Sequence, residues 1–238
     1  KEHELLKLWE GLGYYNRVRN LQLAAREVVD KYSGVLPNDK DELETLKGIG
    51  PYTSGAIASI AFNKKYSAVD GNVLRVFSRL LEIRGDIKEP KTKKKIKEFV
   101  ETLLPNRVGD FNQGLMEIGA TVCLPNGQPH CALCPFNTYC KAYLNQTTKE
   151  IPEKRSKKKR PIKSKTVLVI KYKNKYAIEK RSNQGLLASM YQFPMIDGHL
   201  LLEDVEKLGL GLIENIQDLG ISNHKFTHLE WNIRDYIV

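Results

Sequence analysis

The stretch Leu46-Lys-Gly-Ile-Gly-Pro-Tyr-Thr-Ser-Gly-Ala56 constrains this chain more than any other. It places Gly48 and Gly50 one residue apart, ahead of small residues that predict a helix over Thr53–Phe62. Such a turn points backbone N–H groups outward at a helix N-terminus, where an anion such as a phosphate binds well. We therefore expect a phosphate-binding hairpin between two helices.

A single carboxylate, Asp70, follows the hairpin within Val69-Asp-Gly-Asn-Val-Leu-Arg75. Base excision from DNA needs both a hairpin and a carboxylate, because the hairpin must hold the DNA while the carboxylate takes part in the reaction. The alternative for Asp70, and equally for Asn72, is an ordinary role as a helix cap.

The hydrophobic periodicity divides the chain into two parts. Apolar residues at helical spacing predict an all-α domain over residues 1–149, and alternation with period two predicts a smaller α+β domain over 166–238. Residues 150–165 are rich in Lys, Arg and Pro and indicate a basic linker. Further helices are expected over Arg17–Tyr32, Asn72–Ile83, Thr92–Leu104 and Asp110–Ala120, and a hairpin turn at Lys173–Lys175.

The net charge of +10 suggests a polyanionic partner, although its distribution matters. Lys154–Lys165 holds eight basic residues and no acid, so the rest of the chain sums to +2, which is 10 minus 8. This run and a second one, Lys88–Lys97, fit solvated segments as well as DNA contacts. No run reaches the roughly 18 apolar residues of a membrane span, so no membrane partner is expected.

Both ends of the sequence lie inside structural patterns. Leu5, Leu8 and Leu12 predict a core-facing helix at the start, and Leu229 to Ile233 alternates like a strand near the end. We expect the chain to be part of a longer protein, partial at its N-terminus and incomplete at its C-terminus.

All four cysteines lie within eighteen residues, at Cys123, Cys131, Cys134 and Cys140. Disulfides are one explanation, but closely spaced cysteines in a chain without a secretory signal more often bind metal. Four thiolates suit Zn²⁺ or a four-iron–four-sulfur (4Fe-4S) cluster. The residues alone leave these two metals open.

The run Phe111-Asn-Gln-Gly-Leu-Met-Glu-Ile-Gly-Ala120, the cysteine array and the hairpin with its carboxylate resemble the endonuclease III/MutY superfamily of helix-hairpin-helix DNA glycosylases. The resemblance implies one 4Fe-4S cluster on a loop over 123–140, with a structural role. The first gap, Leu124 to His130, is one residue longer than is usual in that superfamily.

The residue after Pro51 distinguishes branches of the superfamily. Bifunctional members carry a Lys there, which forms a Schiff base that leads to strand cleavage, whereas this chain has Tyr52. Together with Val69–Asn72, Tyr52 and Trp9-Glu-Gly-Leu-Gly-Tyr-Tyr15 resemble adenine DNA glycosylases of the MutY type. This implies removal of adenine mispaired with 8-oxoguanine in double-stranded DNA, without lyase activity.

The resemblance assigns catalytic roles to Asp70, Tyr52 and Asn72. Asp70 is implied to stabilise the positive charge that develops on the sugar, while Tyr52 and Asn72 line the same site.

The resemblance also assigns DNA contacts. Gly48, Ile49 and Gly50 are implied to hold phosphate. Tyr14 matches an aromatic residue that wedges into the duplex, the alternative being a core tyrosine. Gln113 matches a position near the flipped adenine, the alternative being an ordinary amide on a helix surface.

In the second part, Ser182-Asn-Gln-Gly185 and Gln192-Phe-Pro194 resemble a Nudix-like domain that reads the oxidised guanine. A glutamate-rich pyrophosphatase box is missing from the sequence, so no nucleotide hydrolysis is expected. The residues assigned to lesion recognition are His224, Phe226, Thr227 and His228.

The general acid of these glycosylases is a Glu in a helix upstream of the position of Trp9, and no Glu of this sequence fits its place. We therefore expect residues 1–238 to have little or no activity alone. The alternatives are a DNA-binding module without catalysis and a glycosylase/lyase like endonuclease III. The protein is expected to be a monomer, in the cytoplasm at the nucleoid if bacterial, and nuclear or mitochondrial if eukaryotic.

Overall fold

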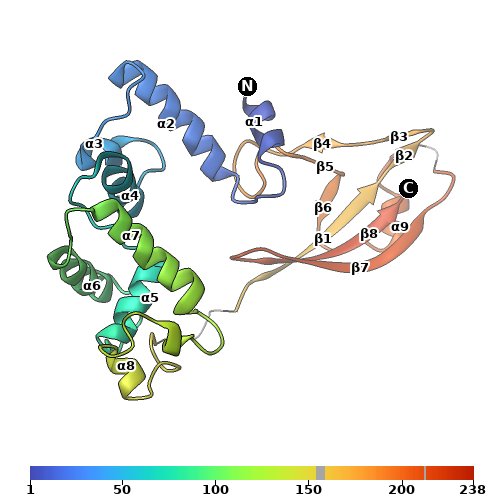
Figure 1. Cartoon of the computed structure of the whole chain (residues 1–238). Helices are drawn as coiled ribbons and strands as arrows, with labels where there is room; N and C mark the ends of the chain where they lie inside the picture. Colours follow the sequence, from blue (N-terminus) through green and yellow to red (C-terminus); the bar gives the residue numbers. More distant parts are fainter. Residues whose placement is uncertain (154–158, 212) are drawn as a thin grey trace. The chain divides into compact units, whose positions relative to one another are not determined.

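The computed structural model describes residues 1–153, 159–211 and 213–238, which belong to two compact units, Lys1–Ser156 and Lys157–Val238 (Figure 1). The boundary lies inside the predicted linker of residues 150–165, of which 154–158 lie outside the described residues. Each end of the predicted linker belongs to one of the two units. Ile151 is buried in the first unit, and residues 162–165 already belong to the first strand of the second.

The first unit is helical, as the sequence predicts. The helical segments that the structure describes are α1 (Glu2–Leu8), α2 (Asn16–Tyr32), α3 (Lys40–Thr45), α4 (Pro51–Phe62), α5 (Gly71–Leu80), α6 (Pro90–Thr102), α7 (Val108–Glu117), the π-helical η1 (Ile118–Val122), the 3₁₀ turn η2 (Cys131–Leu133) and α8 (Lys141–Leu144). Asp39 caps α3 by accepting bonds from the backbone N–H groups of Asp41 and Glu42. This is the helix start that its side chain predicts.

The helix predicted at the chain start is present, but the expectation that it faces the core is wrong. Helix α1 ends at Leu8 and buries none of its residues. Leu8 is 82 % exposed and Leu12 is 66 % exposed. Gly11 and Gly13 adopt positive φ values after Leu8, so the backbone turns and the helical spacing of Leu5, Leu8 and Leu12 is lost.

Two apolar clusters hold the first unit together. One joins α5, α6 and α7 and includes Val73, Phe77, Ile96 and Leu115; the other joins α2, α3 and α4 around Leu43. Figure 1 shows α7 running beside both α4 and α5, and the contacts between these helices confirm that arrangement. Helix α7 therefore connects the element after the hairpin with the element after Asp70.

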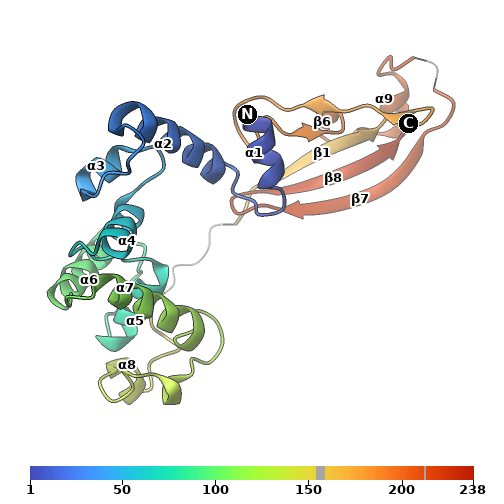
Figure 2. The same ribbon diagram turned by 45° about the horizontal axis from the view of Figure 1, so that its top comes forward.

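The second unit is a small sheet with one short helix. Its strands are β1 (Ile162–Val169), β2 (Lys171–Tyr172), β3 (Lys175–Tyr176), β4 (Glu179–Lys180), β5 (Tyr191–Gln192), β6 (Met195–Asp197), β7 (Gln217–Lys225) and β8 (Glu230–Ile237), with α9 (Leu202–Glu206) between β6 and β7. The main sheet has the order β6-β1-β8-β7, in which β1 and β8 are parallel and the other pairs antiparallel (Figure 2).

The core of this sheet is small, because Leu168, Val205 and Tyr236 are its fully buried members. Every residue of β7 is exposed. The predicted hairpin at Lys173–Lys175 is present between β2 and β3. No helix in the described residues combines the length and the apolar character needed to cross a bilayer.

Candidate active site

The hairpin between α3 and α4 forms as the sequence predicts. Leu46 is buried at its start, and the N–H of Ile49 donates to the Leu46 carbonyl at 3.1 Å. Gly48 has a φ of +83°, and a Cβ at this position would lie 2.6 Å from the Asn20 Cβ. Glycine is therefore required at Gly48 for two reasons, namely its left-handed backbone and its close approach to α2.

A polar contact fastens the two helices beside this turn. The Ser54 hydroxyl donates to the Glu44 carboxylate at 2.7 Å, and Lys40 forms an ion pair with the same carboxylate. The hydrogen bond from Lys40, followed by that from Ser54, lowers the pKa of Glu44. Gly50 occupies the N-cap position of α4 without a capping side chain, so the N–H groups at this end are available to an anion.

Asp70 lies at the start of α5 and uses both of its carboxylate oxygens. Oδ1 accepts from the backbone N–H of Val73 at 2.8 Å, and Oδ2 accepts from the side-chain Nδ2 of Asn72 at 2.8 Å. Asp70 is thus a helix N-cap, as the alternative interpretation holds. The cap also orients the carboxylate, because two donors fix both oxygens.

Arg75 determines which way the Asn72 amide points. It is 8 % exposed, and its Nη2 donates to Asn72 Oδ1 at 2.8 Å and to the Gly119 carbonyl at 2.6 Å. A guanidinium can only donate, so the amide oxygen of Asn72 must face Arg75 and its nitrogen must face Asp70. Burial lowers the pKa of Arg75, whose guanidinium is solvated by carbonyl groups, including that of Cys123 at 2.8 Å.

Tyr52 lies on the first turn of α4 and is 42 % exposed. Its hydroxyl is 3.7 Å from the sulfur of Met116 on α7. Burial, and then the negative charge of Asp70, raises the pKa of Tyr52. Met116 packs against the same apolar cluster as Val69, the residue before Asp70. The raised pKa keeps the Tyr52 phenol protonated at neutral pH.

The two other side chains with predicted DNA contacts, Tyr14 and Gln113, are both exposed. Tyr14 has a φ of +47° in the loop between α1 and α2 and is 71 % exposed, which excludes the alternative of a core tyrosine. Gln113 is exposed on α7, and its amide donates to the Gly109 carbonyl of its own helix at 3.2 Å. The exposed position of Gln113 is compatible both with a contact to the flipped adenine and with an ordinary surface amide.

The four cysteines line one pocket, and all four are free thiols. Arg79 approaches this pocket from α5, and its Nη1 donates to the Cys123 sulfur at 3.2 Å and to the Leu124 carbonyl at 2.9 Å. Burial raises the pKa of Cys131 and of Cys140, and the neighbouring cysteines add to both shifts. Several thiolates on one pocket repel one another, so a shared cationic group would stabilise them.

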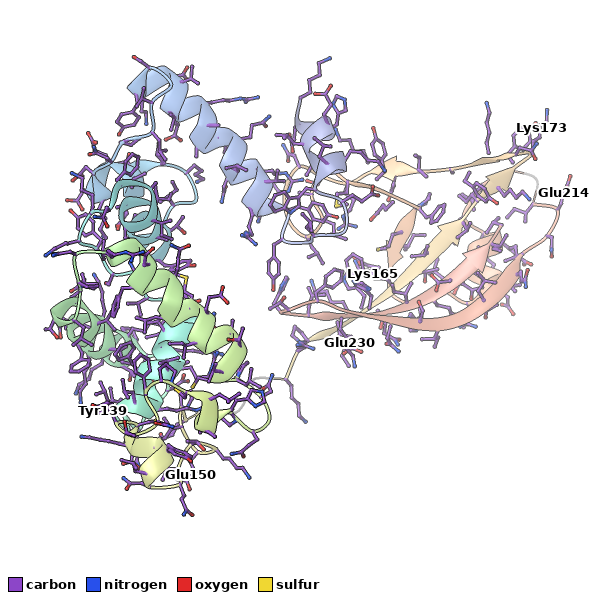
Figure 3. The ribbon with its side chains drawn as sticks, in the orientation of Figure 1. Tyr139, Glu150, Lys165, Lys173, Glu214 and Glu230 are labelled. Atoms are coloured by element: carbon purple, nitrogen blue, oxygen red, sulfur yellow. The ribbon has the colours of Figure 1, made fainter. Side chains whose placement is uncertain are left out.

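The loop that carries these cysteines is otherwise irregular. Tyr139, one residue before Cys140, is 77 % exposed on it, and Figure 3 labels this side chain. Among the described residues, no three His, Cys, Asp or Glu side chains are arranged to hold a single metal ion. The shared pocket fits the donor set of a metal cluster, which four thiolates supply.

In the second unit, the predicted recognition residues surround the turn between β7 and β8. The Phe226 N–H donates to the Leu229 carbonyl at 2.9 Å, which leaves Thr227 and His228 exposed at the turn. The ring of Phe226 lies 4.5 Å from that of His224 and 4.9 Å from that of Trp231. The structure thus brings all four predicted residues together.

Sequence reasoning missed four residues that organise these sites, namely Arg75, Arg79, Asn112 and Trp231. A signal existed for the two arginines, because they lie four residues apart on α5 and the helix is buried from Val73 to Arg79. Cations at buried positions of an otherwise apolar helix indicate specific acceptors. For Asn112 the sequence carries no comparable signal.

Comparison with known proteins gives two family matches. Residues 1–102 match a family described as HhH-GPD superfamily base excision DNA repair protein, and residues 166–238 match the NUDIX domain family. These matches agree with the helical first unit and with the small sheet of the second unit.

Similar sequences come from bacteria, plants and animals. The adenine DNA glycosylase of Buchnera aphidicola subsp. Acyrthosiphon pisum is 33 % identical over 242 residues, which cover all of this chain and 68 % of that protein. The adenine DNA glycosylase of Arabidopsis thaliana is 39 % identical, covering 82 % of this chain and 33 % of that protein. The adenine DNA glycosylase of Mus musculus is 46 % identical, covering 59 % of this chain and 27 % of that protein.

Solved structures resemble the helical unit. A thermostable thymine-DNA glycosylase matches with a TM-score of 0.54 and 33 % identity, covering 61 % of this chain and 67 % of that one. Endonuclease III in a non-covalent complex with DNA matches with a TM-score of 0.52 and 27 % identity over the same shares.

Proposed function

Because this chain belongs to the adenine DNA glycosylase family, we propose that it acts in the excision of adenine paired with 8-oxoguanine in double-stranded DNA. One observation carries the proposal. Asp70 has both oxygens held by donors at the start of α5, and Val69 before it packs against the same apolar cluster as Met116, which the Tyr52 hydroxyl contacts. A fixed carboxylate beside the hairpin suits a reaction that builds positive charge on a sugar held by its phosphates.

In the proposed reaction, the hairpin of Gly48, Ile49 and Gly50 holds the DNA backbone while the adenine nucleotide leaves the stack. The Ile49 N–H shapes the turn by donating to Leu46, so the N–H groups on either side of it are the proposed phosphate donors. The bond between the sugar C1′ and adenine N9 breaks, and its electron pair leaves with the base. Asp70 stabilises the cationic sugar that remains, and Tyr52 and Asn72 keep that carboxylate and the sugar in place. Water then adds to C1′ and loses a proton, the departing adenine gains a proton, and an abasic site remains.

Tyr52 in place of a lysine supports base removal without strand cleavage. A phenol cannot form the imine through which a lysine cleaves the strand. Borohydride reduction during the reaction provides the test, because an imine would become a permanent protein–DNA adduct. A stoichiometric adduct would support the second candidate function, a glycosylase/lyase like endonuclease III.

The second unit is proposed to read 8-oxoguanine through His224, Phe226, Thr227 and His228. Its match to the NUDIX domain family and the exposed turn that bears Thr227 and His228 support this role. The protein is proposed to bind each lesion as a monomer, with the Tyr14 ring inserted into the duplex. The substrate implies work at the nucleoid in a bacterium, or in the nucleus or mitochondria of a eukaryote.

Cys123, Cys131, Cys134 and Cys140 are proposed to hold one 4Fe-4S cluster. The cluster would supply structural cross-linking of the loop over 123–140, and the pocket shared by the four thiols supports it. Purified protein should be brown, with a thiolate-to-iron absorption band and about four iron atoms per chain. A colourless protein with one bound zinc would contradict this assignment.

Residues 1–238 by themselves are proposed to release adenine slowly or not at all, because none of their glutamates takes the place of the family's general acid. An adenine-release assay on an 8-oxoguanine:adenine duplex tests this. Rapid turnover would contradict the proposal and would reveal another acid. Tight, lesion-selective binding without turnover would also fit the other candidate, a DNA-binding module without catalysis.

A further inference from the structure

The loop that leads from α4 to Asp70 is held by a buried amide on α7. Asn112 is 1 % exposed and makes three hydrogen bonds within the protein. Its Oδ1 accepts from the Ala68 N–H at 3.1 Å, and its Nδ2 donates to the Tyr66 carbonyl at 2.9 Å. Nδ2 also donates to the Ser59 hydroxyl on α4 at 2.8 Å. One side chain therefore ties three segments together.

The same loop is confined from its other side. A Cβ at Gly55 of α4 would lie 2.3 Å from the carbonyl oxygen of Ser67, so this helix and the loop approach as closely as glycine allows. The Ser67 hydroxyl donates to Glu101 on α6 at 3.2 Å. Ser67 and Ala68 are both buried. The loop is thus pinned at Tyr66, Ser67 and Ala68, two residues before Asp70.

We propose that Asn112 is a positioning residue that sets the place of the Asp70 carboxylate relative to Tyr52. It does so because its partners lie on the loop before Asp70 and on α4, the helix that begins next to Tyr52. Asn112 touches neither the carboxylate nor the phenol and is not a catalytic residue. The inference rests on the proposed function of Asp70, since positioning matters only if that charge faces the sugar.

Two matched DNA probes measure the placement of this charge without requiring catalysis. Both are duplexes with 8-oxoguanine opposite a sugar analogue, which is a cationic pyrrolidine in one and a neutral tetrahydrofuran in the other. The ratio of the two dissociation constants reports how well a carboxylate is aimed at the cation. A variant that only weakens the fold changes both affinities together and leaves this ratio unchanged.

Asp70→Asn is the reference, because asparagine keeps the helix cap and removes the charge. It should abolish the preference for the cation. Asn112→Leu keeps the volume and removes all three hydrogen bonds, and it should lower the preference about tenfold or more, since misplacement of about 1 Å is that costly at reacting centres. Ser59→Ala is the matched control. It removes one partner of Asn112 but leaves both loop contacts, and it should keep the preference within about twofold.

Gly55→Ala provides an independent route to the same displacement if Asn112→Leu fails to fold. Its added methyl group pushes Ser67 while Asn112 remains intact, so it should lower the preference as Asn112→Leu does. The inference would be overturned if Gly55→Ala and any folded Asn112→Leu kept the wild-type preference for the cation while Asp70→Asn lost it. An unchanged preference in Asp70→Asn would instead overturn the proposed role of Asp70.

Discussion

The Asp70 site and the turn that bears Thr227 are supported in different ways. Asp70 is held by the half-buried Asn72, whose amide is fixed by the buried Arg75, and Arg75 itself donates to Gly119, 44 residues away. Thr227 lies in an exposed turn, held by the local bond from Phe226 to Leu229, by ring contacts and by a bond at 3.3 Å from Arg160 Nε to the Thr227 carbonyl. The contrast indicates that a buried tertiary contact supports the short-range bonds around the Asp70 charge, whereas the turn combines a local bond with an exposed contact from Arg160.

The largest effect is expected from Arg75→Met. It removes the donor for Asn72, Gly119 and Cys123 and leaves these acceptors buried, so the free energy of unfolding should fall by about 3 kcal/mol. Urea unfolding of the whole chain measures the change. Arg75→Lys, which keeps one charged donor group, should lose about half as much. Equal free energies of unfolding for Arg75→Met and wild type would show that the hydrogen bonds of Arg75 do not stabilise the Asp70 site.

Gly48→Ala should have the next effect. Its backbone is left-handed and its Cβ would meet Asn20, so the substitution should cost about 1–2 kcal/mol and weaken DNA binding. Gly50→Ala is the matched control, because its φ of −105° is ordinary and the space around it is open. Thermal unfolding and binding of an undamaged duplex measure both variants. Equal losses in the two would show that the turn does not depend on Gly48.

Trp231→Phe should cost less, about 1 kcal/mol. Trp231 is buried against Phe226, and Arg181 and Lys165 lie over its ring, so the smaller ring loses part of these contacts. Native-state hydrogen exchange in residues 217–237 reports the local change. A loss of stability as large as that expected for Arg75→Met would mean that the turn that bears Thr227 also depends on buried contacts.

The smallest effect on stability is expected from Thr227→Val, which keeps the shape of an exposed side chain and removes its hydroxyl. The free energy of unfolding should change by less than about 0.5 kcal/mol. Discrimination between 8-oxoguanine and guanine opposite adenine should fall about fivefold, which equals one lost hydrogen bond. Competition binding with the two duplexes measures it. Unchanged discrimination would exclude a contact from the Thr227 hydroxyl to the lesion.

Much of the fold could be predicted from the sequence, because its patterns are local. The spacing of apolar residues predicts helices over Arg17–Tyr32 and Thr53–Phe62, and the structure has them over Asn16–Tyr32 and Pro51–Phe62. The first helix shows the limit of such patterns. Leu5, Leu8 and Leu12 have helical spacing, but two glycines with positive φ end the helix and leave Leu8 in solvent.

The sequence by itself determined the chemistry that this protein can offer. Gly48 and Pro51 specify a hairpin that is followed by Tyr52 and not by a lysine, and Asp70 and four cysteines supply a carboxylate and a set of thiols. Only the tertiary structure decided how these groups are held. Asn112 meets Ala68 from 44 residues away and Arg75 meets Gly119 from the same separation. Such contacts depend on how helices pack, and local residue patterns carry no information about partners so distant along the chain.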